Sequence, residues 1–436
     1  MLDKFFSKIE HFVPSRWRWI LNHEGFRRYF TNTGWMFGGQ IFFLALSFFV
    51  GAWMARYLGP HNYGILNYAI SFAGVFAIFS SLGVDGILSR DLVKYPEKRA
   101  EFLGTAFGLK LLGGVLAFGA ATAAALTWEA DPLLRILIIL FSLSFILQAI
   151  NVIAAFFQAD VRAKNNVRVQ MAAAAISALL KIILIIAGGG IIWLIIIYVL
   201  ESLWQGLGFI YVYQKAGQRI GAWHFNKELA RQLWRQSWLL LLSGAAGLIL
   251  ARIDQVIIGR MLGQTAVGFY AVAVKVAEVF YFVPGIISGS LFPAIVNAKK
   301  IGADFYRRRL RNFYGLMGIL AVAAAGLIFI LARPIIIWLF GLDYEPSVGI
   351  LYIYVWSGIG AFIGWAAYQH LLSEDRLRLI LIANLLAMLI NIVLNLFFIP
   401  LWGLKGAALA NLISYFISPA VIFICLAVRR PDRRGS

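Results

Sequence analysis

Apolar residues run along this chain in long stretches, separated by short breaks that are polar or rich in glycine. Many stretches exceed eighteen residues, the length at which an α-helix can cross the hydrocarbon core of a bilayer. A helix covering a soluble core would instead carry an apolar stripe along one face. We therefore predict an all-α membrane protein with twelve transmembrane helices. The predicted spans are 33–55, 64–88, 101–128, 133–157, 167–189, 191–213, 236–258, 268–295, 313–333, 348–372, 377–399 and 404–428.

One loop occurs twice, as Ala55–Gly64 and again as Gly259–Gly268. Arg56, Leu58, Gly59 and Gly64 recur 204 positions later as Arg260, Leu262, Gly263 and Gly268. Leu-Gly and Tyr-Gly pairs are also ordinary turn chemistry, but the shared offset continues into the following apolar run. We interpret the chain as two related halves of six spans, an N-lobe at 33–213 and a C-lobe at 236–428. Internal repeats of this kind are common in transporters.

The chain is strongly basic, with 39 Lys and Arg against 20 Asp and Glu and a net charge of +19. Nucleic-acid binding is one reading of such a charge, but membrane proteins collect cations in their cytoplasmic loops. With the N-terminus placed inside, every inner segment is basic and no outer loop has more than one cation. The outer cations are Arg56, Arg135, Arg260, Arg333 and Lys405. We predict a plasma-membrane protein of bacterial inner or archaeal type, with no nucleic-acid partner. Both termini are then cytoplasmic, and the two lobes share one orientation.

Three further segments flank the lobes. Residues 1–32 mix cations with aromatic rings and predict an amphipathic segment in the cytoplasmic interface, in contact with membrane lipids. Residues 214–235 predict a cytoplasmic linker, either a second interfacial helix or a solvated connection. Residues 429–436 form a basic cytoplasmic tail. The single cysteine, Cys425, excludes an intrachain disulfide and a cysteine-based metal site.

Five motifs follow one another along the chain. They are Thr-Asn-Thr-Gly-Trp at 31–35, Ala-Arg-Tyr-Leu-Gly-Pro with Tyr-Gly at 55–64, Leu-Gly-Val-Asp-Gly-Ile-Leu-Ser-Arg at 82–90, Arg-Ile-Asp-Gln-Val-Ile-Ile-Gly-Arg-Met-Leu-Gly at 252–263 and Gly-Ala-Ala-Leu-Ala-Asn at 406–411. In this order, and with twelve predicted spans, the chain resembles the polysaccharide-biosynthesis flippases. These are the Wzx-type oligosaccharide flippases of the MOP (multidrug/oligosaccharidyl-lipid/polysaccharide) exporter superfamily.

The resemblance implies two six-helix lobes around a central cavity. It also implies export of an oligosaccharide linked to an isoprenoid (polyprenyl) pyrophosphate, from the cytoplasmic to the outer leaflet, by alternating access. Other polysaccharide-assembly membrane proteins are conceivable partners of such a flippase.

Ionisable residues inside the predicted spans are candidates for function, because burying a charge there costs at least about 2.5–3.5 kcal/mol. The cations are Lys110, Lys181, Arg252 and Lys275. Fixed cations lining a cavity would lower the barrier for a pyrophosphate, whose oxygens Arg can hold with two parallel hydrogen bonds. The carboxylates are Glu201, Asp254 and Glu278. They are candidates for coupling to a proton or sodium gradient, and no other cofactor is predicted.

Structural pairing is the alternative for several of these charges. Lys275 and Glu278 are three residues apart on one helix and can pair with each other. Arg252 or Lys275 could neutralise Asp254, and Arg252 could also extend toward the interface. For Lys110 and Lys181, which have no carboxylate three or four residues away, we favour exposure to the cavity.

Polar residues form a similar stripe on the fifth span of each half. Gln170, Ser177 and Lys181 correspond to Asn384, Asn391 and Asn395, each 214 positions later. Positions separated by seven and four lie on one helix face. The stripe either holds helices together or lines the cavity and meets sugar hydroxyls. On the second reading Asn391 and Asn395, together with Gln40 in the first span, are substrate-cavity candidates.

Span eight carries Pro284, Gly285 and Gly289. A proline inside a helix removes one backbone hydrogen bond and bends the helix. The element is either flexible, as alternating access would need, or a static kink. Span two, its counterpart, has no proline, which suggests that the two halves are mechanically different.

The sequence also lacks motifs that would indicate an enzyme. It has no GxxxxGK[ST] loop and no HExxH or nucleophile elbow, so we predict a transporter without catalytic residues or a metal. Three rivals stay open: an ion-coupled multidrug exporter of the same superfamily, with Glu201 as its carboxylate; a lipid II flippase, which usually has fourteen spans; and a membrane polymerase or ligase acting on lipid-linked glycans.

Overall fold

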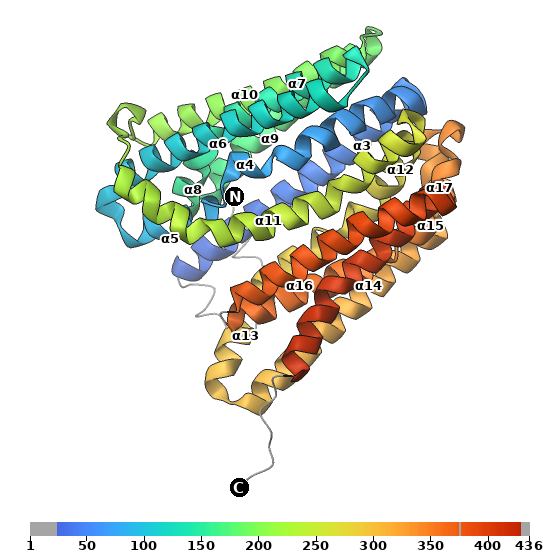
Figure 1. Ribbon diagram of the computed structural model, residues 1–436. Coiled ribbons are helices and arrows are strands. Elements are labelled where there is room, and N and C mark those ends of the chain that lie inside the picture. The colour runs from blue at the N-terminus through green and yellow to red at the C-terminus, as the bar shows by residue number, and fades with distance from the viewer. Residues whose placement is uncertain (1–23, 375, 429–436) are drawn as a thin grey trace, which may run out of the picture.

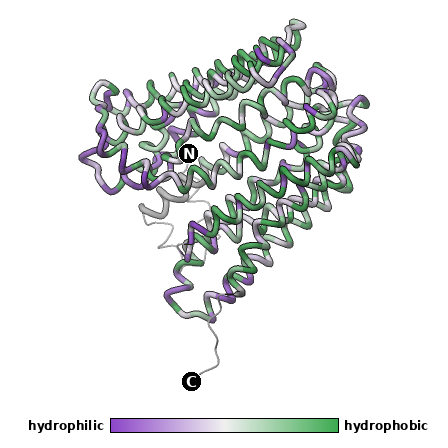
Figure 2. The backbone as a smooth tube through the Cα atoms, in the orientation of Figure 1, coloured by the Kyte–Doolittle hydropathy of each residue, from purple (hydrophilic) through white to green (hydrophobic). Residues whose placement is uncertain are grey.

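The computed structural model describes residues 24–374 and 376–428, and these are helices joined by short turns. Most of the predicted interfacial segment 1–32 and the predicted tail 429–436 lie outside the described residues. Within the described residues, ten helical segments are long and apolar enough to cross a membrane. Polar positions gather at the ends of the helices, and their lengths are mainly apolar (Figure 2). The chain is therefore a multi-pass membrane protein.

The first half contains eight α-helices: α3 (Glu24–Phe76), α4 (Ile78–Ser81), α5 (Asp85–Lys94), α6 (Arg99–Trp128), α7 (Pro132–Leu147), α8 (Val152–Ala159), α9 (Ala163–Ile186) and α10 (Ile191–Lys215). The second half contains α11 (Lys227–Leu262), α12 (Gln264–Ala277), α13 (Val283–Ile301), α14 (Ala303–Phe340), α15 (Pro346–Tyr354), α16 (Ser357–Ser373) and α17 (Leu377–Val428). Five short 3₁₀ turns join them: η2 (Pro96–Lys98), η3 (Gln148–Asn151), η4 (Ile220–Ala222), η5 (Glu278–Phe280) and η6 (Leu342–Tyr344).

The two longest helices each contain a glycine whose backbone is not helical. Gly59 in α3 has φ 68°, and Gly403 in α17 has φ 57°, a region that glycine enters without strain. The 53 residues of α3 would measure about 80 Å as a straight helix, far more than the roughly 30 Å hydrocarbon core. The glycine therefore divides each of these helices into two limbs.

The helices form two groups that meet at one end (Figure 1). One group contains α6, α7, α9 and α10, the other contains α13, α14, α16 and α17, and α3, α11 and α12 run between them. The groups come together near α12 and α15 and diverge toward their opposite ends. We call the first the joined end and the second the splayed end.

The two copies of the repeated loop contact each other at the joined end. A side chain added at Gly64 would overlap the carbonyl of Gln264, and one added at Gly268 would overlap the carbonyl of Pro60. The His61 Nδ1 atom lies 3.1 Å from Thr265 Oγ1, and these residues are also 204 positions apart. Equivalent positions thus exchange places across the contact, which is the geometry of a local two-fold axis.

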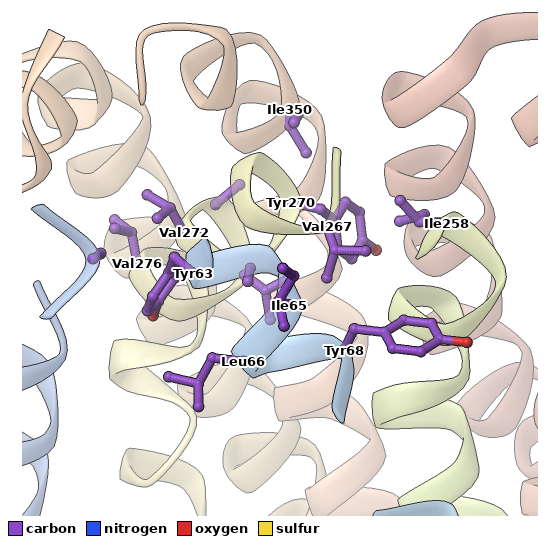
Figure 3. Close-up of a cluster of buried hydrophobic side chains, with 14 of the residues drawn as sticks. Tyr63, Ile65, Leu66, Tyr68, Ile258, Val267, Tyr270, Val272, Val276 and Ile350 are labelled. Carbon is purple, nitrogen blue, oxygen red and sulfur yellow. The ribbon is translucent and has the colours of Figure 1, made fainter. Parts of the chain in front are cut away.

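The largest cluster of buried hydrophobic residues contains side chains from both halves. It joins Tyr63 and Leu66 of α3 to Val272 and Val276 of α12 and to residues of α14, α15 and α17. Figure 3 shows these side chains of α3 and α12 gathered with Ile258 and Ile350. The smaller clusters are separate: one joins α4–α6 and α8–α10 to the start of α11, and two lie within the C-lobe. Apolar packing therefore seals the joined end, and a smaller cluster also joins the N-lobe to the first part of α11.

Several predicted spans are interrupted in the structure. Span two ends at Phe76, and the rest of its predicted range forms α4 and α5. Span eight is interrupted by η5, and α13 restarts at Val283 with Pro284 in its first turn. Spans four and ten also break, at η3 and between Tyr354 and Ser357. The breaks at Ala77 and at η3 each have a counterpart about one repeat later, whereas the second break in span two, between α4 and α5, falls opposite the continuous helix α13.

The predicted linker 214–235 divides between a loop and a helix. Its second part is continuous with span seven as α11, whose first turn is capped by Asn226 through bonds from the Glu228 and Leu229 backbone N–H groups. Leu233 packs in the same core cluster as Leu88 and Leu92 of α5. The linker therefore adds to the N-lobe at the splayed end.

Candidate functional site

A cavity of about 170 Å³ lies where α3, α9, α10 and α12 meet. Its charged lining residues are Lys181, Glu201 and Lys275. Apolar and small residues of α3, from Phe43 to Met54, make up much of the remaining wall. Two predicted cations and one predicted carboxylate thus come together, and they give the cavity a net charge of +1. We call it the N-lobe cavity.

Lys181 is held in place by groups on α9 and α10. Its Nζ lies 3.3 Å from Glu201 Oε2 and 3.6 Å from the ring centroid of Tyr198. Ser177 Oγ donates to the same Glu201 oxygen at 2.6 Å. Because Ser177 and Lys181 are four residues apart on α9, and Tyr198 and Glu201 three apart on α10, each pair lies on one helix face. Two residues of the predicted stripe of the fifth span, Ser177 and Lys181, therefore converge on one carboxylate.

Lys275 extends into the cavity from α12, and its ammonium has different neighbours from that of Lys181. Its ammonium lies against the backbone of Gly51 on α3, where any added side chain would overlap it. Among the described residues Lys275 forms no salt bridge with a carboxylate, whereas Lys181, in the same cavity, does. Glu278, the predicted partner on the same helix, instead accepts a hydrogen bond from Tyr354 at 3.1 Å.

Arg252, Asp254 and Glu278 lie in a second group of charges, on α11 and η5. Asp254 is buried and accepts from Tyr270 at 2.6 Å and from Asn411 at 3.1 Å. Its other oxygen accepts from the Gln255 backbone N–H at 2.7 Å. Arg252, two residues before Asp254 on α11, is exposed.

A second cavity, of about 360 Å³, lies in the C-lobe between α11, α16 and α17. Aromatic, amide and hydroxyl side chains line it, and we call it the C-lobe cavity. Asn384 of the predicted stripe is among its lining residues. Asn391 and Asn395 are completely buried, and Asn395 Nδ2 donates to the side-chain oxygen of Asn391 at 3.1 Å. Both lie on α17, and neither is among the lining residues of the C-lobe cavity.

The remaining candidates lie apart from these cavities. Lys110 Nζ donates to Asp85 Oδ1 at 2.7 Å. The two residues are on different helices, Lys110 on α6 and Asp85 on α5. Gln40 is exposed on α3, one turn before the first residue of the N-lobe cavity. Gly289 is exposed on α13, and a side chain at Gly285 would touch only Trp365, at 3.9 Å.

Two residues that shape the N-lobe cavity had no signal in the sequence. Gly51 permits the approach of Lys275, and Tyr198 places its ring beside Lys181. Glycine and tyrosine are frequent in membrane helices, so composition alone does not single these two out. Within the described ranges, no three His, Cys, Asp or Glu side chains gather in a way that could hold a metal ion.

Comparison with known proteins identifies the family to which the chain belongs. A family model described as polysaccharide biosynthesis protein matches residues 30–299. The probable flippase AglR of Haloferax volcanii is 29% identical over 175 residues, which are 37% of this chain and 35% of AglR. The alignment thus spans only about a third of that relative.

Two solved structures share the fold. An inward-facing conformation of a multidrug resistance MATE family transporter of the MOP superfamily has a TM-score of 0.73 at 14% identity, covering 88% of this chain and 93% of that one. The lipid II flippase MurJ in an inward closed conformation has a TM-score of 0.70 at 15% identity, covering 89% and 86%. At such identities the similarity concerns the fold alone.

Proposed function

Because this chain belongs to the polysaccharide biosynthesis protein family, we propose that it is a flippase for a polyprenyl-pyrophosphate-linked oligosaccharide. It moves the headgroup from the cytoplasmic to the outer leaflet by alternating access, as a transporter and not as an enzyme. The similarity to a probable flippase over part of the chain supports this proposal. The observation that carries it is the N-lobe cavity, where two ammonium groups face one carboxylate.

The proposed topology has twelve passages with both termini in the cytoplasm. Ten candidate spans become twelve when the limbs on either side of Gly59 and Gly403 are counted separately. The alternation of basic and cation-poor segments supports this orientation. It places the joined end outside and the splayed end toward the cytoplasm, so the lobes would receive a substrate from the inner leaflet.

Charge complementarity explains why the N-lobe cavity suits a pyrophosphate. The group carries at least two negative charges and must cross a medium of low dielectric constant, where fixed cations act strongly. Lys275 lines the cavity and forms no salt bridge among the described residues, so it can meet a phosphate oxygen directly. The polyprenyl tail stays in the lipid while the headgroup occupies the cavity between the lobes.

The proposed coupling starts from competition for Lys181. A bound phosphate and Glu201 would both attract this ammonium, which lies 3.3 Å from the Glu201 carboxylate. Protonation of Glu201, or its binding of a sodium ion, would release Lys181 to the substrate. Asp254 and Glu278 are further titratable candidates, buried or half-buried at the boundary of the lobes.

The test is transport in reconstituted vesicles. A fluorescent polyprenyl-pyrophosphate oligosaccharide is placed in one leaflet, and a membrane-impermeant glycosidase reports how much of it reaches the other. We expect transfer that depends on the protein. Empty vesicles and vesicles with heat-inactivated protein are the controls.

The second candidate is an ion-coupled multidrug exporter, which Glu201 favours because it is a carboxylate inside the first-half cavity. In the same vesicles, absence of lipid transfer combined with ion-driven efflux of a cationic dye would contradict the flippase and support the exporter.

A further inference from the structure

The C-lobe cavity differs from the N-lobe cavity in its chemistry. Its lining residues come from α11, α16 and α17, with Tyr281 added from the turn before α13. None of these lining residues, all in the described part of the chain, carries a formal charge. Its volume of about 360 Å³ lies within the roughly 300–1,000 Å³ typical of small-molecule sites. Such a cavity offers no counter-ion to a phosphate or to a cationic drug.

Flat aromatic surfaces form one part of its wall. Trp365 is 42% exposed and Tyr368 is 36% exposed, although both belong to a membrane-spanning helix. Their ring centroids are 6.2 Å apart and their planes are inclined at 74°, so the two faces point in different directions. Gly247 and Gly364 also line the cavity, and a side chain added at either would meet open space. An exposed ring in such a space is suited to stacking against the apolar face of a sugar.

An oriented amide forms another part of the wall. Asn384 Nδ2 donates to Ser243 Oγ at 3.1 Å, and Asn384 Oδ1 accepts from Ser418 Oγ at 3.1 Å. An amide has two N–H donors and an oxygen with two lone pairs, so these bonds use half of its capacity. The two serines fix the orientation of the amide, and its other donor and lone pair can meet a hydroxyl group. A hydrocarbon chain would leave this capacity unsatisfied.

We propose that the C-lobe cavity binds neutral sugar rings of the lipid-linked substrate, by stacking on Trp365 and by hydrogen bonds to Asn384, while the N-lobe cavity holds the pyrophosphate. This inference rests on the proposed flippase function. It assigns recognition of the charged group and of the glycan to different lobes. Closure of the lobes on a complete substrate would then require both parts.

The experiment compares two ligands that differ only in the sugar. Full-length protein in nanodiscs is titrated with undecaprenyl pyrophosphate and with undecaprenyl pyrophosphate carrying N,N′-diacetylchitobiose. We expect the wild type to bind the glycosylated probe about tenfold more tightly, the order of one stacking contact plus one hydrogen bond. Trp365→Ala and Asn384→Leu should each remove most of this difference and leave binding of the bare pyrophosphate unchanged.

Two variants guard against a general loss of structure. Trp365→Phe keeps an aromatic face and should retain much of the preference for the glycosylated probe. Trp338→Ala removes a tryptophan that is 77% exposed on α14, away from the cavity, and should change neither affinity. Trp365 can also report directly: the glycosylated probe should change the fluorescence of the wild type more than that of Trp365→Phe.

The outcomes separate this inference from the proposed function. Equal affinity of the wild type for both probes would overturn the sugar site and leave the flippase intact. An equal loss for both probes in Trp365→Ala would also overturn it, because the cavity would then hold the lipid or the phosphate. If the wild type binds neither probe, the proposed function fails as well.

Discussion

Lys181 and Lys275 line the same cavity in different electrostatic states. Lys181 is 3.3 Å from the Glu201 carboxylate and lies over the Tyr198 ring. Lys275 forms no salt bridge among the described residues. A substrate phosphate therefore displaces no salt-bridged carboxylate from Lys275, whereas it must share Lys181 with Glu201. We infer that Lys275 makes the stronger contact with the substrate.

Lys275→Met keeps the length of the side chain and removes its charge. We expect it to weaken binding of undecaprenyl pyrophosphate by about ten- to a hundredfold, because hydrogen bonds to charged groups contribute about 1.5–3 kcal/mol. Titration of the variant in nanodiscs measures this effect. The matched control is Lys299→Met, which removes a lysine that donates to the Ser373 carbonyl in another part of the C-lobe. A similar loss in both variants would mean that general surface charge, and not the cavity, attracts the lipid.

Gly51→Ala tests the position of the Lys275 ammonium without removing it. The added methyl group would overlap Nζ, the end of a flexible side chain, so we expect a folded protein with a displaced charge. Pyrophosphate binding should fall several-fold while the melting temperature stays near that of the wild type. Gly74→Ala, on the same helix with open space around it, is the control. Unchanged pyrophosphate binding in Gly51→Ala would show that binding does not depend on the position of the Lys275 ammonium beside Gly51.

At the scale of single residues, the sequence predicted the charges of the site and left their partners open. Lys181, Glu201 and Lys275 could be singled out because an ionisable group is rare in an apolar run. Whether Lys275 would pair with Glu278 depended on rotamers and on packing against α3, which spacing along one helix does not determine. The partner of Lys110 is Asp85, on another helix, so no local pattern could identify it.

At the scale of elements, the positions of the spans follow from hydrophobicity, but their interruptions do not. Pro284 appeared to explain a bend peculiar to span eight, yet span two breaks at the equivalent place without a proline. A second break in span two, at Leu82 and Gly83, both with positive φ, has no counterpart in α13. A side chain at Gly83 would approach the Leu241 backbone nitrogen to 2.8 Å, so close packing against α11 requires this turn. Tertiary contact, and not local propensity, therefore determines the break.

At the scale of the whole molecule, the internal repeat in the sequence predicted the relation between the two halves. Gly59 and Gly263 have nearly the same backbone conformation, with φ 68° and 85°, and the loops that contain them meet at the joined end. The offset along the sequence indicated that the loops are related. That they would contact each other is a consequence of two similar lobes packing around one axis, which requires the three-dimensional arrangement.

Polar contacts between the halves reinforce the joined end. Arg260 Nη2 donates to the Trp128 carbonyl and lies 3.4 Å from Glu129 Oε1, which also accepts from Tyr68 at 2.5 Å. Tyr344 of the C-lobe donates to the Ala55 carbonyl of the N-lobe at 2.8 Å. Release of a headgroup at this end requires these contacts and the apolar core around them to separate. The structure is therefore one state of the proposed cycle, closed at the joined end.

A reversible cross-link between the repeated loops would test whether the joined end must separate. His61→Cys and Thr265→Cys, combined with Cys425→Ser, place two thiols where the native side chains lie 3.1 Å apart. A short bifunctional reagent that forms a disulfide with each thiol should stop lipid transfer in vesicles, because each transport cycle has to open this contact. A reductant, which cleaves these disulfides, should restore transfer. The control is Ser89→Cys with Gln158→Cys, a pair within the N-lobe whose native side chains are 3.3 Å apart. Cross-linking this pair should leave transfer intact. Transfer at the wild-type rate with the loops cross-linked would refute alternating access through the joined end and would place the exit of the headgroup elsewhere.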